Sequence, residues 1–277
     1  MQKMHDFMRA LFSPWSIRTG LHRAWLVGGL ALAAVSTAVP AQSSPAGPLK
    51  VAAAANLKFV LADLEIQYRQ QTGQAVQFNF GASVQLARQI QQGLPVQLFI
   101  SADEEQVAWL QQNGLTQDGG QRYAIGRLAL ISLQTHPLAK SASPEAALRA
   151  LAPADKLALA NPQLAPYGLA AQQALQKIGV WSGLQKQVVL GENIGQATQY
   201  VLTGAAPLGF TAFALTLAPE TAGQFKVWPV PPDWHAPLNQ RMVLLKGASP
   251  QAQAFRDYLL SPQARALFLK HGYALPQ

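Results

Sequence analysis

The stretch KVAAAANLKFVLADL, residues 50–64, decides how the rest of the chain is interpreted. Its small apolar residues predict a short buried strand that stops at Ala55, and Asn56 stands where a helix N-cap is expected. The backbone N–H groups at such a helix start favour an anion, and the tiny side chains before it allow a ligand to approach closely. The helix that follows carries its apolar side chains on one stripe: Leu57, Val60, Leu61, Leu64 and Tyr68.

Strand and helix patterns alternate along the rest of the chain, which predicts an α/β fold with mostly parallel sheets. Residues 75–80 alternate apolar and polar side chains as a strand does, and residues 81–83 then begin a helix with Ser83 as its natural cap. Residues 123–133 form an apolar run broken at Gly126, which suits a strand that leaves one domain for another. Residues 227–237 hold four prolines and are expected to form a loop. Further strands are expected at 96–100, 157–160, 188–189, 208–214 and 242–245, and further helices near 107, 145, 166, 193 and 250.

The N-terminus is typical of an export signal. A basic leader precedes an apolar run at 24–35, and Val39-Pro40-Ala41 supplies small residues for cleavage, so residues 1–41 are interpreted as a signal peptide and 42–48 as a linker. The run is shorter than the roughly 20 residues that span a bilayer, and we expect a periplasmic protein cleaved near Ala41. The mature chain is expected to form two lobes, with 49–126 and 246–277 in lobe I and 127–245 in lobe II.

The composition excludes several classes of function. None of the 277 residues is a cysteine, which excludes disulfides, thiolate metal sites, cysteine nucleophiles and a bacterial lipoprotein anchor. The formal charge of +8 invites a nucleic-acid partner, but four of the 21 basic and one of the 13 acidic residues lie in the predicted signal peptide. The remaining 17 basic residues are spread thinly among 12 acidic ones, so we expect no nucleic-acid binding.

Four helix starts fall after strands, two in each expected lobe: Asn56, Ser83, Pro166-Tyr167-Gly168 and Asn193-Ile194-Gly195. Ligands of open α/β sheets bind outside the carboxyl ends of the strands, so a cleft between the lobes would gather all four. None carries Lys or Arg, which favours a small anion held by neutral donors over a phosphorylated metabolite. Each residue also has a simpler interpretation: Asn56 and Ser83 as N-caps, Tyr167 as packing, and Ile194 as a contributor of its backbone N–H alone.

Several stretches resemble the periplasmic molybdate-binding proteins of bacterial ABC transporters, which have the type II periplasmic-binding fold. The resemblance extends from Leu49 to the C-terminus and is carried by AAAANL at 52–57, SVQLARQI at 83–90, LFISAD at 98–103, NPQLAPYG at 161–168 and APLG at 206–209. It implies two lobes, each a mostly parallel sheet flanked by helices, with a cleft that binds molybdate or tungstate. It also implies a membrane permease of the ABC transporter as partner, a monomer, and neither a cofactor nor an enzymatic activity.

The same resemblance implies the residues of the site. They are Ala55 and Asn56 in the first loop, Ser83 in the second, Tyr167 in the third, and Ile194 in the fourth through its N–H. This chain departs from the family at Ala55, where some relatives have a hydroxyl residue, and at Ala212, where others have a tyrosine. We expect the Tyr167 hydroxyl to replace the tyrosine that is absent at Ala212. Selectivity over sulfate is expected from cavity size, since both ions are tetrahedral dianions.

Other functions remain open at this point. The site could take another tetrahedral oxyanion, such as sulfate or phosphate. An exported hydrolase would use Ser83 as nucleophile, but its surroundings lack the second glycine of a nucleophile elbow, and neighbours mark none of His136, His235 and His271 as a base. No paired histidines have metal-ligand spacing, so no direct metal ligands are expected. A ligand-gated sensor would use the same fold, although the export signal argues against it.

Overall fold

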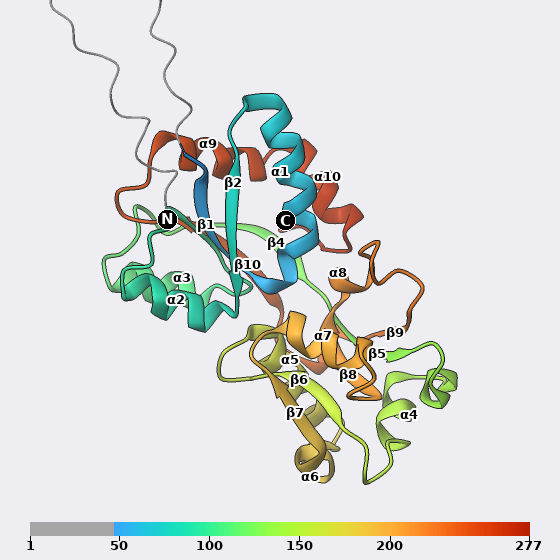
Figure 1. The fold of residues 1–277 in the computed structure, drawn as a ribbon. Helices are drawn as coiled ribbons and strands as arrows, with labels where there is room; N and C mark the ends of the chain where they lie inside the picture. The colour runs from blue at the N-terminus through green and yellow to red at the C-terminus, as the bar shows by residue number, and fades with distance from the viewer. Residues whose placement is uncertain (1–46) are drawn as a thin grey trace, which may run out of the picture. The chain divides into compact units, whose positions relative to one another are not determined.

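The computed structural model describes residues 47–277, and the predicted signal peptide and most of the predicted linker lie outside the described residues. Two five-stranded sheets, each flanked by helices, form two lobes (Figure 1). In each sheet four of the five strands point the same way, because a single strand runs antiparallel to both of its neighbours. The predicted two-lobed α/β fold with mostly parallel sheets is therefore confirmed.

The first lobe is built on the sheet β2-β1-β3-β10-β4, with β10 as the antiparallel strand. Its strands are short and carry buried apolar residues, and the helices pack their apolar faces against the sheet. The strands are β1 (Leu49–Ala54), β2 (Val76–Gly81), β3 (Leu98–Ile100), β4 (Gln121–Gly126) and β10 (Leu238–Leu244). The helices are η1 (Ala55–Leu57), α1 (Lys58–Thr72), α2 (Ser83–Gln91), α3 (Glu105–Gln112), α9 (Pro250–Leu259) and α10 (Pro262–Lys270).

The second lobe repeats the plan on the sheet β7-β6-β8-β5-β9, with β5 as the antiparallel strand. The strands are β5 (Leu128–Leu133), β6 (Leu157–Ala160), β7 (Val188–Gly191), β8 (Leu208–Ala212) and β9 (Phe225–Pro229). The helices are η2 (Pro137–Lys140), α4 (Pro144–Arg149), α5 (Pro166–Lys177), α6 (Trp181–Leu184), η3 (Gln185–Gln187), α7 (Ile194–Leu202), α8 (Phe213–Thr216) and η4 (Pro232–Trp234). Within residues 47–277 no helix is long and apolar enough to cross a membrane.

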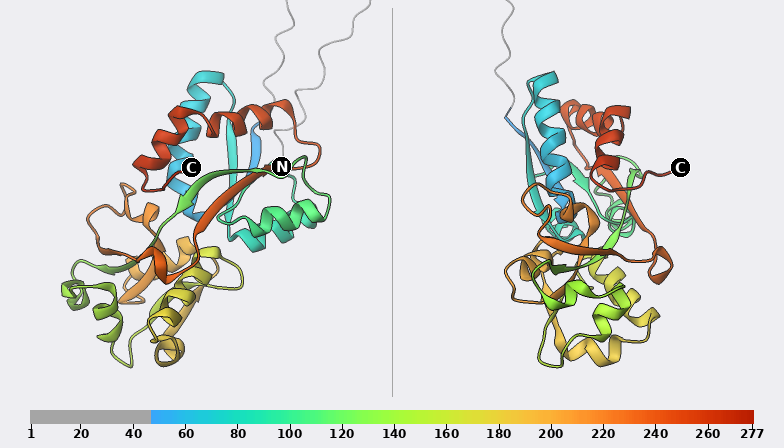
Figure 2. Two further views of the ribbon diagram at one scale, coloured as in Figure 1. Left: turned by 180° about the vertical axis from the view of Figure 1, so that it is seen from behind. Right: turned by 90° about the vertical axis from the view of Figure 1, so that its right-hand side faces the viewer.

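Two connections join the lobes, and both are visible from behind in Figure 2. The first is the turn at Arg127 between β4 and β5, as the break at Gly126 predicts. The second runs through residues 230–237, between β9 and β10. The predicted boundary of lobe II at residue 245 is wrong, because β10 pairs with β3 and β4 in the first sheet. The polar pair at Gln240 and Arg241 hides the start of this strand in the sequence.

The prediction of loop throughout 227–237 is also wrong, because β9 pairs with β5 along Phe225–Pro229. The strand lies at the edge of the second sheet. A proline is tolerated there, because its missing N–H is not needed to pair with a further strand. Its apolar residues Phe225 and Trp228 are buried against the lobe. The prolines therefore hid this strand in the sequence, although a strand at a sheet edge can contain them.

The C-terminal helices pack on the first lobe, as predicted. Phe255 of α9 is fully buried and meets the Tyr68 ring of α1 edge-on, with 4.9 Å between centroids. Phe268 of α10 is buried beside Tyr123 and Tyr273. This packing closes the first lobe with residues from both ends of the described chain.

Candidate functional site

A small pocket lies where the two lobes meet, and all five predicted site residues line it. The space in it is about 10 Å³, close to that of a single water and too small for an organic metabolite. Segments of both lobes approach closely here, since the Val84 N–H donates to the Leu164 carbonyl at 3.1 Å. The lining residues are Ala54, Ala55, Asn56, Gly81, Ala82, Ser83, Ala102, Ala165, Pro166, Tyr167, Asn193 and Ile194.

Asn56 is buried in η1, directly after β1, and does not cap a helix. Its Nδ2 donates to Gln240 Oε1 and to the Tyr273 hydroxyl, each at 3.1 Å, while its Oδ1 is buried without a partner among the described residues. The Tyr273 hydroxyl in turn donates to the Asn56 carbonyl at 2.8 Å. The capping interpretation is therefore wrong. The side chain instead ties the first site loop to β10 and to the C-terminal segment, and the N–H groups of Ala55 and Asn56 belong to a helix start.

Ser83 is the first residue of α2, and the N-cap position belongs to Ala82, so the predicted cap at Ser83 is also wrong. The fully buried Ser83 Oγ accepts a hydrogen bond from the Ala102 N–H at 3.0 Å. The Ser83 hydroxyl has no acceptor among the described residues, so its proton is available to a ligand in the pocket. Ser83 thus holds the loop after β3 while presenting a donor.

Tyr167 enters the pocket from the second lobe, as the second residue of α5 behind Pro166. Its hydroxyl accepts a hydrogen bond from Gln240 Nε2 at 3.1 Å. Burial raises the pKa of the Tyr167 hydroxyl above its usual value, so the group stays protonated at neutral pH. No described residue accepts this proton, which leaves Tyr167 as a donor.

Ile194 is the first residue of α7, and its N–H therefore has no intrahelical acceptor. The helix is capped by Asn193, whose Oδ1 accepts from the Gln196 N–H at 3.1 Å. Gly195 faces the first lobe, since a Cβ placed there would lie 3.9 Å from the Ala55 Cβ. The predicted helix start therefore meets the first site loop across the boundary between lobes.

The pocket lining contains no charged residue. The nearest acid in sequence is Asp103, next to the lining residue Ala102; burial raises its pKa to about 6, against hydrogen bonds from the Gln106 N–H and Ser101. Glu104 is held at 2.7 Å by Arg122 and by Arg241, and the hydrogen bond from Arg122 lowers its pKa. An anion would be held here by neutral donors and helix ends.

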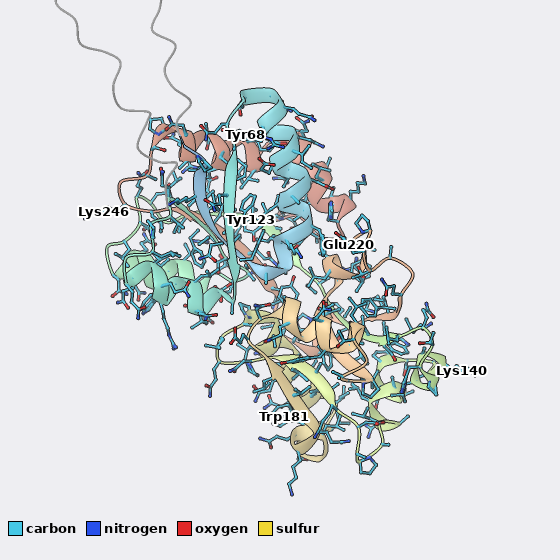
Figure 3. All side chains as sticks on the ribbon, viewed as in Figure 1. Tyr68, Tyr123, Lys140, Trp181, Glu220 and Lys246 are labelled. Carbon is cyan, nitrogen blue, oxygen red and sulfur yellow. The ribbon has the colours of Figure 1, made fainter. Side chains whose placement is uncertain are left out.

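Sequence patterns missed a group of residues behind the pocket. Gln240 is fully buried, and its Oε1 accepts from Asn56 and from the Tyr123 hydroxyl at 2.8 Å. The Ser101 carbonyl, 2.9 Å from the Tyr123 hydroxyl, is a second acceptor for the same proton. Figure 3 shows Tyr123 within the first lobe. Burial raises the pKa of the Tyr123 and Tyr273 hydroxyls, so both stay protonated. The one sequence signal was the presence of a polar Gln240 in an apolar strand.

The arrangement offers binding rather than chemistry. None of the histidines within residues 47–277 hydrogen-bonds Ser83: His271 pairs with Asp63 at 2.8 Å, and His136 and His235 bond backbone groups of their own loops. In the same range, no cluster of three acidic or histidine side chains could hold a metal ion. Ala212 does not line the pocket.

Two α/β lobes that enclose a small neutral pocket define a solute-binding protein. Residues 49–274 match the family of bacterial extracellular solute-binding proteins, and the chain belongs to this family.

Several relatives within this class are named as molybdate-binding proteins. The chain is 34% identical to molybdate-binding protein ModA of Rhodobacter capsulatus over 94% of its own length and 97% of that protein. It is also 34% identical to ModA of Azotobacter vinelandii, over 87% of this chain and 96% of the relative. The solved Azotobacter vinelandii periplasmic molybdate-binding protein superposes with a TM-score of 0.76 at 33% identity, covering 83% of this chain and all of that one. The resemblance stated from the sequence is thus confirmed, and so is the expectation of a binding protein rather than an enzyme.

Proposed function

We propose that this protein captures molybdate, and also tungstate, in the periplasm and delivers the ion to the membrane permease of an ABC transporter. The observation that carries this proposal is the convergence of Asn56, Ser83, Tyr167 and Ile194 on one small uncharged pocket. Membership of an extracellular solute-binding family and the similarity to proteins named for molybdate binding support the choice of ion and of compartment.

Neutral donors are sufficient for tight binding of a dianion. The candidate donors are the hydroxyls of Ser83 and Tyr167 and the N–H groups at the starts of η1, α2 and α7. A hydrogen bond to a charged group contributes about 1.5–3 kcal/mol, so roughly six of them supply about 9–18 kcal/mol before the cost of association. Nanomolar affinity requires about 12 kcal/mol.

Sulfate is the second candidate ligand, because it has the same shape and charge. The cavity decides between the two ions: donors that span molybdate stand too far from the smaller sulfate, and each buried donor left unpaired costs about 1–3 kcal/mol. We therefore propose that sulfate binds more weakly by a factor of at least about 100.

Isothermal titration with molybdate, tungstate and sulfate tests the proposal. We expect saturable 1:1 binding of the first two ions and weak or no binding of sulfate. Tyr167→Phe tests the site itself, since it removes one proposed donor and leaves the helix start in place, and it should weaken molybdate binding. Equal binding of all three ions, or binding of none, would contradict the proposed ligand. Size-exclusion chromatography during the same preparation tests the proposed monomer.

A further inference from the structure

Gln240 links the two lobes directly behind the pocket. The residue belongs to β10 of the first sheet, is fully buried, and donates from Nε2 to the Tyr167 hydroxyl of the second lobe at 3.1 Å. The pairing of β10 with β4 shifts register between Gln240 and Arg241. This amide is the polar group that joins Tyr167 to the first site loop through Asn56.

The other end of the amide faces two donors. Gln240 Oε1 accepts from Asn56 Nδ2 at 3.1 Å and from the Tyr123 hydroxyl at 2.8 Å, and an amide nitrogen could accept neither bond. In this arrangement Nε2 faces Tyr167, where it donates to a lone pair of the phenol oxygen. A phenol that accepts from Nε2 cannot donate to Gln240, so its single proton remains for the pocket.

We propose that Gln240 is a positioning residue for the oxyanion: it holds the Tyr167 hydroxyl in place and turns its proton toward the ligand. This role rests on the proposed function and adds a residue to it that does not line the pocket. The reversed amide would accept the Tyr167 proton and remove one donor from the site.

Gly126 provides the space for this contact. A Cβ at Gly126 would overlap both the Tyr167 hydroxyl and Gln240 Nε2. Gly126 is the last residue of β4, next to the connection at Arg127, so the hydrogen bond between the lobes lies over the first connection. The glycine that ends β4 therefore also leaves the space for the hydrogen bond between Gln240 and Tyr167.

Gln240→Met tests the role with little risk to the fold. Methionine has a similar length and shape without an amide, and the partners of Oε1 keep other acceptors: Tyr273 for Asn56 Nδ2, and the Ser101 carbonyl for the Tyr123 hydroxyl. The Tyr123 hydroxyl therefore keeps an acceptor, and Asn56 Nδ2 keeps one of its two. The Tyr167 hydroxyl loses the donor that Gln240 supplies.

A double-mutant cycle with molybdate separates positioning from packing. We expect Gln240→Met to raise the Kd about tenfold and Tyr167→Phe to raise it about 10- to 150-fold. If Gln240 acts through the Tyr167 hydroxyl, adding Gln240→Met to Tyr167→Phe changes the Kd by less than about twofold. A full additional tenfold loss would show that Gln240 acts by packing and would overturn the inference.

Two further variants complete the experiment. Gln240→Glu replaces the donor with a carboxylate that accepts the Tyr167 proton, and we expect a larger loss of affinity than with Gln240→Met. Gln97→Met is the matched control: Gln97 Oε1 accepts from the Ser249 N–H at 2.8 Å before β3, away from the pocket, and its loss should leave the Kd unchanged. Wild-type protein that binds no oxyanion would refute the proposed function, whereas binding with equal Kd in wild type and Gln240→Met would refute this inference alone.

Discussion

Replacing Ser83 with alanine separates two roles of one hydroxyl. The buried Oγ accepts from the Ala102 N–H at 3.0 Å, and its proton is available to the ligand. Removing the donor should weaken molybdate binding by about 1.5–3 kcal/mol, a rise in Kd of about 10- to 150-fold. Removing the acceptor leaves the Ala102 N–H, on a residue 2% exposed, without its partner and should lower the free energy of unfolding by about 1–3 kcal/mol.

Both losses are measurable on one preparation, by titration with molybdate and by urea unfolding of the ligand-free protein. Ser143→Ala is the control, because Ser143 caps α4 through the Ala146 N–H at 3.0 Å. It should lower stability by about 1 kcal/mol and leave the Kd unchanged. A Ser83→Ala protein that is less stable but binds molybdate with unchanged Kd would show that Ser83 only holds the loop at Ala102.

Three further substitutions test the pocket, the acid nearest to it in sequence, and the core. Gly126→Ala should weaken molybdate binding by about 1–3 kcal/mol in the same titration, because the new Cβ overlaps the Tyr167 hydroxyl; an unchanged Kd would show that the hydroxyl tolerates displacement. Asp103→Asn should stabilise the protein at pH 7: burial raises the carboxyl pKa from 3.8 to about 6, so ionisation destabilises the fold as pH rises from about 4 to 6. The shift corresponds to at most about 3 kcal/mol, and partial exposure reduces the expected gain to about 1–2 kcal/mol. Urea unfolding should show this gain above pH 6 and none near pH 4, and a gain independent of pH would contradict the assignment. Phe255→Ala should lower the free energy of unfolding by about 3–5 kcal/mol, and a loss below 1 kcal/mol would contradict the packing of α9 on α1.

The alternation of strands and helices could be predicted because it depends on local patterns. Residues 157–160 form β6 as expected, and α5 begins at Pro166 where a proline in the first turn suits a helix. Since parallel strands place their carboxyl ends together, four helix starts could be expected to meet before any contact between them was known. The pocket brings those segments together.

The functions of the side chains at those starts were less predictable. Asn56 and Ser83 have the residue types of N-caps, but each bonds a distant segment instead: Asn56 contacts Gln240 and Tyr273, and Ser83 contacts Ala102. Capping preferences describe competition between a side chain and its nearest backbone. They do not include a partner that lies 184 or 217 residues away in the sequence.

Gln240 shows why a site of neutral donors needs more than its lining residues. A lysine or arginine attracts an anion in any orientation, whereas a hydroxyl attracts it only when its proton points inward. The proton of Tyr167 points inward because an amide donates to its oxygen, and Asn56 and Tyr123 donate to the oxygen of the same amide. An uncharged site therefore depends on a buried network that fixes the direction of each donor. In this protein that network includes a strand residue whose polarity concealed the start of its strand.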